Sequence, residues 1–257
     1  MSVLSVKAAA KVNLVLEVLG ERSDGYHEVS TILQEVPEVF DTLTLKRATK
    51  TSLKCNDSAV PTDRNNTILI ALDILQGMLK AKANYQITLE KAIPLYSGLG
   101  GAASDAAAFL KAVNEDLGIG LTRAQQLEIL QKVSSDAAFF LEGGLQLATG
   151  RGEKLSTLPN LPPCEIRIIG TGVKISTKEA YQKLELPFPR DALKTYQVIE
   201  GLRELDIDKI AANLHNDFQP QTVKEHPEIQ KALDKARAEG ALASMLCGSG
   251  GAIFAIF

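Results

Sequence analysis

The sequence predicts an α+β protein, and three observations support this prediction. Segments with the two-residue alternation of strands are mixed with segments of helical spacing, without a strict strand–helix–strand order. The 257 residues are 45% apolar and 23% charged, which suits a globular chain with a sizeable core. The segment 159–163 (PNLPP) is the best candidate for a domain boundary, so we expect lobes at 1–158 and 159–257.

The first half of the chain opens with a predicted strand over residues 12–19. Its apolar residues share one face while Lys11, Asn13 and Glu17 share the other, and a surface strand is the simplest interpretation. The pair Asp24-Gly25 is a hairpin signal. The elements predicted after it are strands at 27–36, 42–46 and 85–89, a helix over 68–79, a glycine-rich loop over 98–105 and a helix over 106–113.

The second half has clearer boundaries. Thr122 and Gln125 form a capping box at the start of a helix. Strands are predicted at 145–149, 154–158 and 165–169, and the last helix at 227–239, between a proline and a glycine. The uncharged stretch 240–257 is long enough to suggest a membrane span, but its centre is Cys247-Gly248-Ser249-Gly250-Gly251. Two short buried strands around a glycine turn explain it better.

Charge and cysteine content exclude several classes of partner. Lys plus Arg is 28 and Asp plus Glu is 31, a net charge of −3 with no basic block, so nucleic acid is not an expected partner. The three cysteines and three histidines lack the spacing of metal ligands. Residues 1–11 (MSVLSVKAAAK) contain no long apolar stretch, so we do not expect a signal peptide. We therefore expect a cytoplasmic protein without membrane contact.

The sharpest local motif is the segment 94–105 (PLYSGLGGAASD). Its glycines allow the backbone to approach a ligand, and the following helix offers its positive end, which together favour a phosphate cradle. The Gly-Lys-Ser/Thr ending of a Walker A loop is absent, and the match to a dinucleotide fingerprint is weak. A plain strand-to-helix turn remains the alternative.

Three further positions leave alternatives open. The glycines 248–251 either present backbone donors to a ligand or form a tight turn; the segment is not a hydrolase elbow, because Cys247 takes the place of a glycine. Asp136 precedes an apolar run, which favours a helix N-cap over a carboxylate at the edge of a cleft. Tyr26 and His27 lie at a loop tip, where binding residues often occur.

Four separated segments together resemble one family. They are Ala9 to Leu14 with Asp24 to Glu28; Ile93 to Ala107; Ser135 to Phe140 with Gly143-Gly144 and Gly150 to Glu153; and Asn216-Asp217 with Met245 to Gly250. In this order they resemble the GHMP small-molecule kinases. The segment Asp24 to Glu28 (DGYHE) is similar to the subfamily that phosphorylates 4-diphosphocytidyl-2-C-methyl-D-erythritol in the non-mevalonate isoprenoid pathway, rather than to mevalonate or homoserine kinases.

The resemblance implies a two-lobed fold with the active site in a cleft between the lobes, and a role for each matching residue. Asp136 would be the general base and Lys11 would stabilise the transferred charge. Asn13 would orient the erythritol part, Tyr26 and Tyr181 would sandwich the cytosine, and His27 would read its edge. The residues implied for ATP are Pro94, Gly98, Leu99, Gly100, Gly101, Ala102, Ala103 and Ser104, with Asn66 on the adenine side and Ser104 also near Mg²⁺.

The chain departs from the family pattern in its phosphate loop. Ala102 and Ala103 stand where a glycine and a serine are usual, and Ala9 replaces a proline. The resemblance also leads us to expect a second lobe that is shortened at its end. The expected partners are ATP, Mg²⁺ and the cytidyl-linked sugar alcohol, and we expect a monomer or weak homodimer. The alternatives are another GHMP kinase with a different alcohol, or a nucleotide-binding protein with a degenerate phosphate loop.

Overall fold

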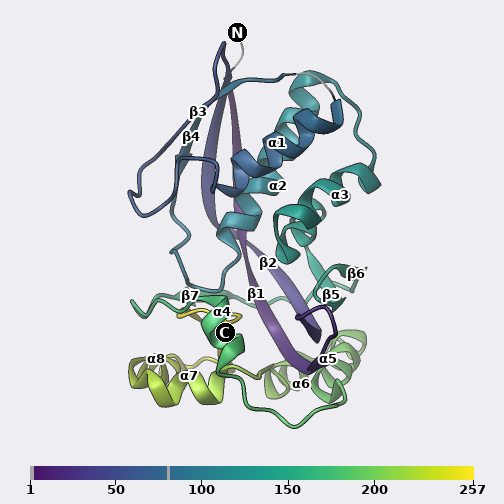
Figure 1. The fold of residues 1–257 in the computed structure, drawn as a ribbon. Helices are drawn as coiled ribbons and strands as arrows, with labels where there is room; N and C mark the ends of the chain where they lie inside the picture. Colours follow the sequence, from purple (N-terminus) through teal and green to yellow (C-terminus); the bar gives the residue numbers. More distant parts are fainter. Residues whose placement is uncertain (1–2, 80–81) are drawn as a thin grey trace. The chain divides into compact units, whose positions relative to one another are not determined.

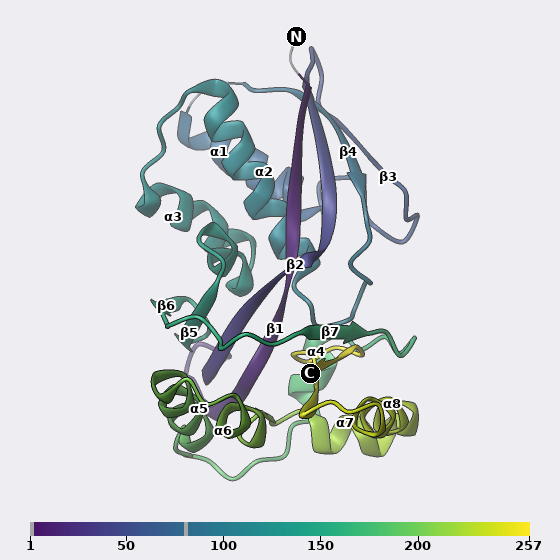
Figure 2. The same cartoon turned by 180° about the vertical axis from the view of Figure 1, so that it is seen from behind.

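The computed structural model describes residues 3–79 and 82–257 (Figures 1 and 2). Over these residues strands and helices are mixed, as predicted, and the chain divides into two compact units. Unit 1 holds residues up to 10, 37–93 and 100–142; unit 2 holds 11–36, 94–99 and 143–257. The units interleave along the sequence, which is a different division from the expected lobes, and the boundary at 158/159 stays a prediction.

Two long strands, β1 (Val3–Glu21) and β2 (His27–Arg47), contribute residues to both units. β1 is longer than the predicted 12–19, and β2 replaces the two strands expected at 27–36 and 42–46. The sequence pattern breaks at Pro37, but this residue is exposed, and a strand tolerates a missing N–H where no ladder bond is needed.

Unit 1 has helices beside a small group of strands. Thr42–Arg47 of β2 pairs antiparallel with β4 (Tyr85–Glu90), and β3 (Ser52–Cys55) pairs parallel with β4. The helices are α1 (Thr67–Leu79), α2 (Gly101–Leu117), α3 (Arg123–Val133) and the 3₁₀ helix η1 (Ser135–Leu141). They pack on one another, and Figure 1 shows α1, α2 and α3 gathered on one side of the strands. β3 was missed because four residues carry too little alternation.

Unit 2 contains the remaining strands. Val29–Gln34 of β2 pairs antiparallel with β5 (Leu145–Gly150), which pairs with β6 (Lys154–Thr157), and β1 pairs parallel with β8 (His215–Asn216) through Val15 and Leu16. A separate sheet has the order β7 (Ile166–Ile169), β10 (Ile253–Ile256), β9 (Ala243–Leu246). The helices are α4 (Thr177–Gln182), α5 (Leu193–Glu204), α6 (Ile207–Ala212), α7 (Gln219–Glu225) and α8 (Pro227–Ala238).

The C-terminal stretch is a hairpin, as predicted. β9 and β10 pair antiparallel with Leu246 opposite Ile253, and both strands are mostly buried. Across residues 3–79 and 82–257, none of the helices combines the length and apolar character needed to span a bilayer. The absence of charge in 240–257 therefore reflects burial in a sheet.

Candidate active site

Lys11 and Asn13 lie on the same face of β1, and both are buried. The Lys11 Nζ donates to Asn13 Oδ1 at 2.7 Å and to the carbonyl of Gly98 at 2.9 Å. Asn13 Nδ2 donates to Thr31 Oγ1 at 2.8 Å, which fixes the amide. The predicted surface strand is wrong here, because the segment 94–99 lies against β1: the Lys11 side chain meets the carbonyl of Gly98, and the backbone N–H of Lys11 donates to the carbonyl of Leu99 at 3.0 Å.

Two glycine segments meet beside these side chains. A Cβ on Gly98 would lie 1.7 Å from the carbonyl oxygen of Cys247, and one on Gly250 would lie 2.0 Å from the nitrogen of Gly98. A Cβ on Gly248 would lie 3.2 Å from Asn13 Oδ1 and 3.3 Å from Lys11 Nζ. At Gly98 and Gly250 only a residue without a side chain allows this approach. We call Lys11, Asn13, Gly98, Gly248 and Gly250 the glycine core.

The turn over 248–251 closes the hairpin between β9 and β10. Its N–H at Gly251 donates to the carbonyl of Tyr96 at 3.0 Å, and the N–H of Ala252 donates to the carbonyl of Ser97 at 3.2 Å. The predicted glycine turn is therefore confirmed, and the presentation of backbone donors to a ligand stays a prediction. These two donors hold the segment 94–99 in place.

The predicted phosphate loop becomes helical earlier than the sequence pattern indicates. α2 begins at Gly101, so the expected loop over 98–105 is wrong from that residue onward. Ala102 and Ala103 favour helix, and Gly100, with φ of +74°, is the N-cap. The N–H of Ser104 donates to the carbonyl of Gly100 at 2.9 Å. By helix geometry, the N–H groups of residues 101–103 have no acceptor within the helix, which suits an anion.

The start of α1 is tied to the first turn of α2. Asn66 Oδ1 accepts from the N–H of Ile68 at 2.9 Å, and its Nδ2 donates to the carbonyl of Pro61 at 2.7 Å. Thr67 Oγ1 donates to the carbonyl of Ala102 at 2.7 Å. The buried Asn66 thus fixes the beginning of α1. The next residue, Thr67, contacts α2, the helix that follows the predicted phosphate loop.

Asp136 lies in the first turn of η1, and its expected role as an N-cap is wrong. The N-cap is Ser134, which has a φ of −165° and makes no side-chain capping bond. The apolar residues that follow Asp136, from Ala137 to Phe140, are buried, while Asp136 itself is half-buried. η1 packs against α2, and Lys111 Nζ donates to the carbonyl of Phe140 at 3.1 Å. The carboxylate is thus held on a fixed element at the boundary of the core of unit 1.

A buried ionic cluster beneath α2 was missed by the sequence analysis. Lys91 Nζ contacts Asp41 Oδ2 and lies 2.9 Å from Asp105 Oδ2. Burial raises the pKa of Asp105 to about 7, although Lys91 opposes this. Burial alone lowers the pKa of Lys91, but Asp105 and Asp41 outweigh it and hold that pKa above its ordinary value. Asp105 within the apolar run 102–110 was the signal that could have revealed the cluster.

Four residues form a second neighbourhood in unit 2, which we call the aromatic group: Tyr26, His27, Arg151 and Tyr181. The rings of His27 and Tyr181 have centroids 4.8 Å apart and are tilted by 32°. The Arg151 guanidinium lies 4.5 Å from the centroid of the Tyr26 ring, which is 51% exposed. Tyr181 also packs edge-on against Phe218 at 4.8 Å. One face of the Tyr26 ring is therefore covered by a cation, and the Tyr181 ring packs on Phe218.

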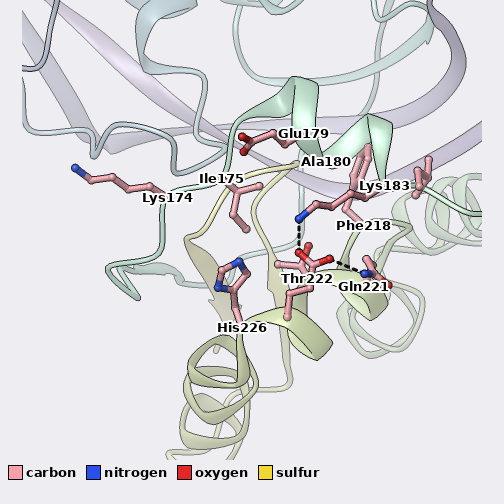
Figure 3. A pocket seen from close by; sticks show the side chains of 11 residues that line it. Lys174, Ile175, Glu179, Ala180, Lys183, Phe218, Gln221, Thr222 and His226 are labelled. Atoms are coloured by element: carbon pink, nitrogen blue, oxygen red, sulfur yellow. Dashed lines mark hydrogen bonds and ion pairs between the residues drawn. The ribbon is translucent and has the colours of Figure 1, made fainter.

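A pocket lies beside α4, the helix that carries Tyr181 (Figure 3). Most of its lining comes from residues within or directly beside α4 and α7, and Lys183 and Gln221 both bond to Glu225, at 2.7 Å and 2.6 Å. No residue predicted for the active site lines it, but Phe218 does. Phe218 therefore contacts both this pocket and Tyr181.

The structure thus brings several predicted residues together within unit 2. Lys11 contacts both Asn13 and Gly98, and His27 contacts Tyr181. The other predicted residues, Asn66, Asp136 and residues 100–104, belong to unit 1 and are described within it. Their assigned roles stay predictions.

Comparison with known proteins gives matches to two family models. The description "GHMP kinases N terminal domain" matches residues 66–144, and "GHMP kinases C terminal" matches residues 198–257. Together they cover more than half of the chain.

Curated relatives and solved structures match nearly the whole chain. A 4-diphosphocytidyl-2-C-methyl-D-erythritol kinase of Listeria innocua is 36% identical over 98% of this chain and 87% of its own length. One of Caldicellulosiruptor bescii is 36% identical over 99% and 89%. A crystal structure of a 4-(cytidine 5'-diphospho)-2C-methyl-D-erythritol kinase has a TM-score of 0.80 at 27% identity, covering 98% of this chain and 90% of that one. A homoserine kinase from Cytophaga hutchinsonii, at 23% identity and TM-score 0.81, covers 100% and 85% and shares the fold.

Proposed function

Because the chain belongs to the GHMP kinases, and within them to the 4-diphosphocytidyl-2-C-methyl-D-erythritol kinases, we propose that it phosphorylates the 2-hydroxyl of that cytidyl-linked sugar alcohol with ATP. The observation that carries the proposal is the 36% identity over 98% of the chain. The glycine core and the aromatic group support it, because they offer a charge-stabilising cation and a place for a base.

The reaction needs one bond formed and one broken. The acceptor oxygen attacks the γ-phosphorus of ATP, the bond from that phosphorus to the β–γ bridging oxygen breaks, and ADP leaves. We propose that Asp136 takes the proton of the 2-hydroxyl, and that Lys11 stabilises negative charge on the transferred group. The hydrogen bonds from Lys11 to Asn13 and Gly98 hold the ammonium in one position before substrate arrives.

Binding of ATP is assigned to the phosphate loop and the start of α2. The segment from Pro94 through Gly98, Leu99 and Gly100 would enclose the phosphates, and the N–H groups of residues 101–103 would donate to them. Asn66 would lie on the adenine side. The glycine contacts described above keep the loop backbone fixed, which is what in-line phosphoryl transfer requires.

Magnesium is proposed as part of the nucleotide substrate. In the described part of the chain, no group of three or more His, Cys, Asp or Glu residues forms a metal site. This fits an ion held mainly by phosphate oxygens, with the Ser104 hydroxyl as the protein ligand at the start of α2. When bound, Mg²⁺ neutralises charge on the phosphates.

Recognition of the acceptor is assigned to the aromatic group. The base would stack between Tyr26 and Tyr181, on the face of Tyr26 opposite Arg151. His27, which contacts Tyr181, would read the edge of the cytosine, and Asn13 would orient the erythritol. The compartment, proposed as cytoplasmic, and the monomeric or weakly dimeric state follow from the sequence expectations alone.

The test is ADP release with ATP and the cytidyl-linked acceptor, comparing wild type with Asp136→Asn. We expect the substitution to lower kcat by about 10²–10⁴-fold, the usual contribution of a general base. Asp73→Asn is the matched control, because Asp73 is an exposed carboxylate on α1 of the same unit. Full activity of Asp136→Asn would remove the base. ADP release only with an alcohol lacking the cytidyl group would overturn the substrate, and ATP binding without turnover would overturn the kinase.

A further inference from the structure

The ionic cluster of Lys91, Asp41 and Asp105 lies in unit 1, and the proposed mechanism does not use it. The exposed fractions of the three side chains are 5%, 0% and 4%. Asp41 Oδ1 also accepts from the N–H groups of Ala92 and Ile93, at 2.6 Å and 2.8 Å. Among the described residues, Asp105 Oδ1 is the buried side-chain oxygen that lacks a hydrogen-bond partner. The cluster therefore holds two carboxylates and one ammonium out of water.

Such a cluster is poor as a source of stability. Removing three charged groups from water costs more than their mutual attraction returns unless every hydrogen bond is satisfied, and here one oxygen is not. Buried ionic groups of this kind are explained better by a positional role than by a contribution to folding, and the elements they join indicate which position is fixed.

The cluster joins the strands of unit 1 to the first two turns of α2. Asp41 directly precedes the part of β2 that pairs with β4, and Lys91 directly follows β4. Asp105 is in the second turn of α2, one residue beyond Ser104. A Cβ on Gly101 would lie 3.0 Å from Lys91 Nζ and 3.1 Å from Ile93 Cγ2, so the ammonium also lies against the backbone of the first helical residue.

We propose that Lys91 is a positioning residue for ATP: its ammonium, held by Asp41, fixes Asp105 and Gly101 and thereby the first turn of α2, whose N–H groups meet the phosphates. The inference deepens the proposed function and rests on it, because it requires that this turn binds ATP. Lys91 should therefore affect the binding of ATP and leave the binding of the cytidyl-linked acceptor unchanged.

The experiment compares Lys91→Met with Arg47→Met. Arg47 on β2 pairs with Asp116 at 2.6 Å, near the C-terminal end of the same helix, so this control removes a link between the same elements at the end far from the loop. Calorimetric titration with ATP gives Kd, and steady-state kinetics with each substrate varied gives both KM values. All measurements are made at the same interval below each variant's Tm.

We expect Lys91→Met to weaken ATP binding by about tenfold or more, to raise the KM for ATP in parallel, and to change the KM for the acceptor by less than about twofold. Arg47→Met should leave both constants near wild type. If the single variant does not fold, the double variant Lys91→Met/Asp105→Asn replaces it in the experiment. It removes the charge that Asp105 would carry without Lys91, while Asp41 keeps its two backbone donors. It should show the same selective loss for ATP.

Unchanged ATP affinity in a folded variant would overturn the inference, and so would an equal rise of both KM values or an equal effect of Arg47→Met. The titration separates this from failure of the proposed function. If the wild type binds ATP but phosphorylates no cytidyl-linked acceptor, the substrate assignment fails while the Kd comparison still decides the role of Lys91.

Discussion

The glycine core and the aromatic group lie in the same unit but are held in opposite ways. In the glycine core, backbone meets backbone so closely that a methyl on Gly98 would lie 1.7 Å from a carbonyl oxygen. In the aromatic group, the ring centroids of His27 and Tyr181 are 4.8 Å apart, and the Arg151 guanidinium lies 4.5 Å from the centroid of the Tyr26 ring. Tyr26 is 51% exposed. The first has no room to adjust, whereas the second leaves the Tyr26 ring half exposed.

This difference separates two tasks. A cation that stabilises transferred charge must be fixed before the reaction, since reorganisation during the chemical step would cost rate. A stacking surface for a base tolerates small movements, because dispersion and area burial vary gradually with ring position. Substitutions in the glycine core should therefore affect folding, and those in the aromatic group should affect binding of one substrate.

The largest expected effect is that of Gly98→Ala. Gly98 has φ of +81°, and the added methyl would collide with the backbone at Cys247 and Gly250. We expect a loss of more than about 4 kcal/mol in the free energy of unfolding, or failure to fold, since backbone atoms cannot move aside as a side chain does. Urea unfolding followed by circular dichroism measures it.

Gly25→Ala is a matched control for this prediction. Gly25 has the same φ of +81°, but nothing lies within 4 Å of its added Cβ. We expect it to lose only about 1–2 kcal/mol, the cost of the left-handed conformation itself. Equal losses in the two variants would show that the close contact at Gly98 contributes nothing, and the contrast between the two neighbourhoods would fail.

Local signals in the sequence predicted local structure well. The capping box of Thr122 and Gln125 is present, with the threonine side chain accepting from the N–H of Gln125 and the glutamine side chain accepting in return. Both partners lie within four residues, so the sequence contains the whole interaction. The hairpin around 248–251 was predictable for the same reason, because its strands and turn are contiguous.

The burial of Lys11 and Asn13 could not be predicted in this way. Their apparent solvent face is covered by residues such as Gly98 and Gly248, which are remote in sequence. Alternation along β1 cannot reveal a covering segment so distant. The cluster of Lys91, Asp41 and Asp105 has the same property, and the functional roles were available only through a resemblance to a family.

A smaller effect is expected from Tyr181→Leu. Leucine keeps an apolar contact with Phe218 but removes the ring proposed to stack on the cytosine. Loss of one stacked base costs about 1–3 kcal/mol, so the KM for the cytidyl-linked acceptor should rise by about 5–150-fold while the KM for ATP stays within twofold. Steady-state kinetics with each substrate varied tests it.

The control for Tyr181→Leu is Phe188→Leu. The Phe188 ring is also near His27, with centroids 6.3 Å apart, and packs on the same apolar cluster as Tyr181, but no stacking role is assigned to it. We expect a change of less than about twofold in the acceptor KM. If the two variants behave alike, Tyr181 is a packing residue and the proposed base site is wrong.

The smallest expected effect is that of Arg151→Gln, which sharpens the description of the aromatic group. Arg151 follows Gly150, whose N–H donates to Glu28 Oε1 at 3.1 Å, so the loop carrying the guanidinium is fixed near Tyr26. An exposed cation–π contact contributes about 0.5–1 kcal/mol, and its loss would free the Tyr26 ring to rotate, raising the acceptor KM by about two- to fivefold.

Arg151→Lys keeps a cation and should recover part of this loss, whereas a merely structural loop residue would show no difference between glutamine and lysine. An acceptor KM that rises by tenfold or more in Arg151→Gln would mean that the guanidinium contacts the acceptor itself, and Tyr26 would then no longer be the residue through which Arg151 acts.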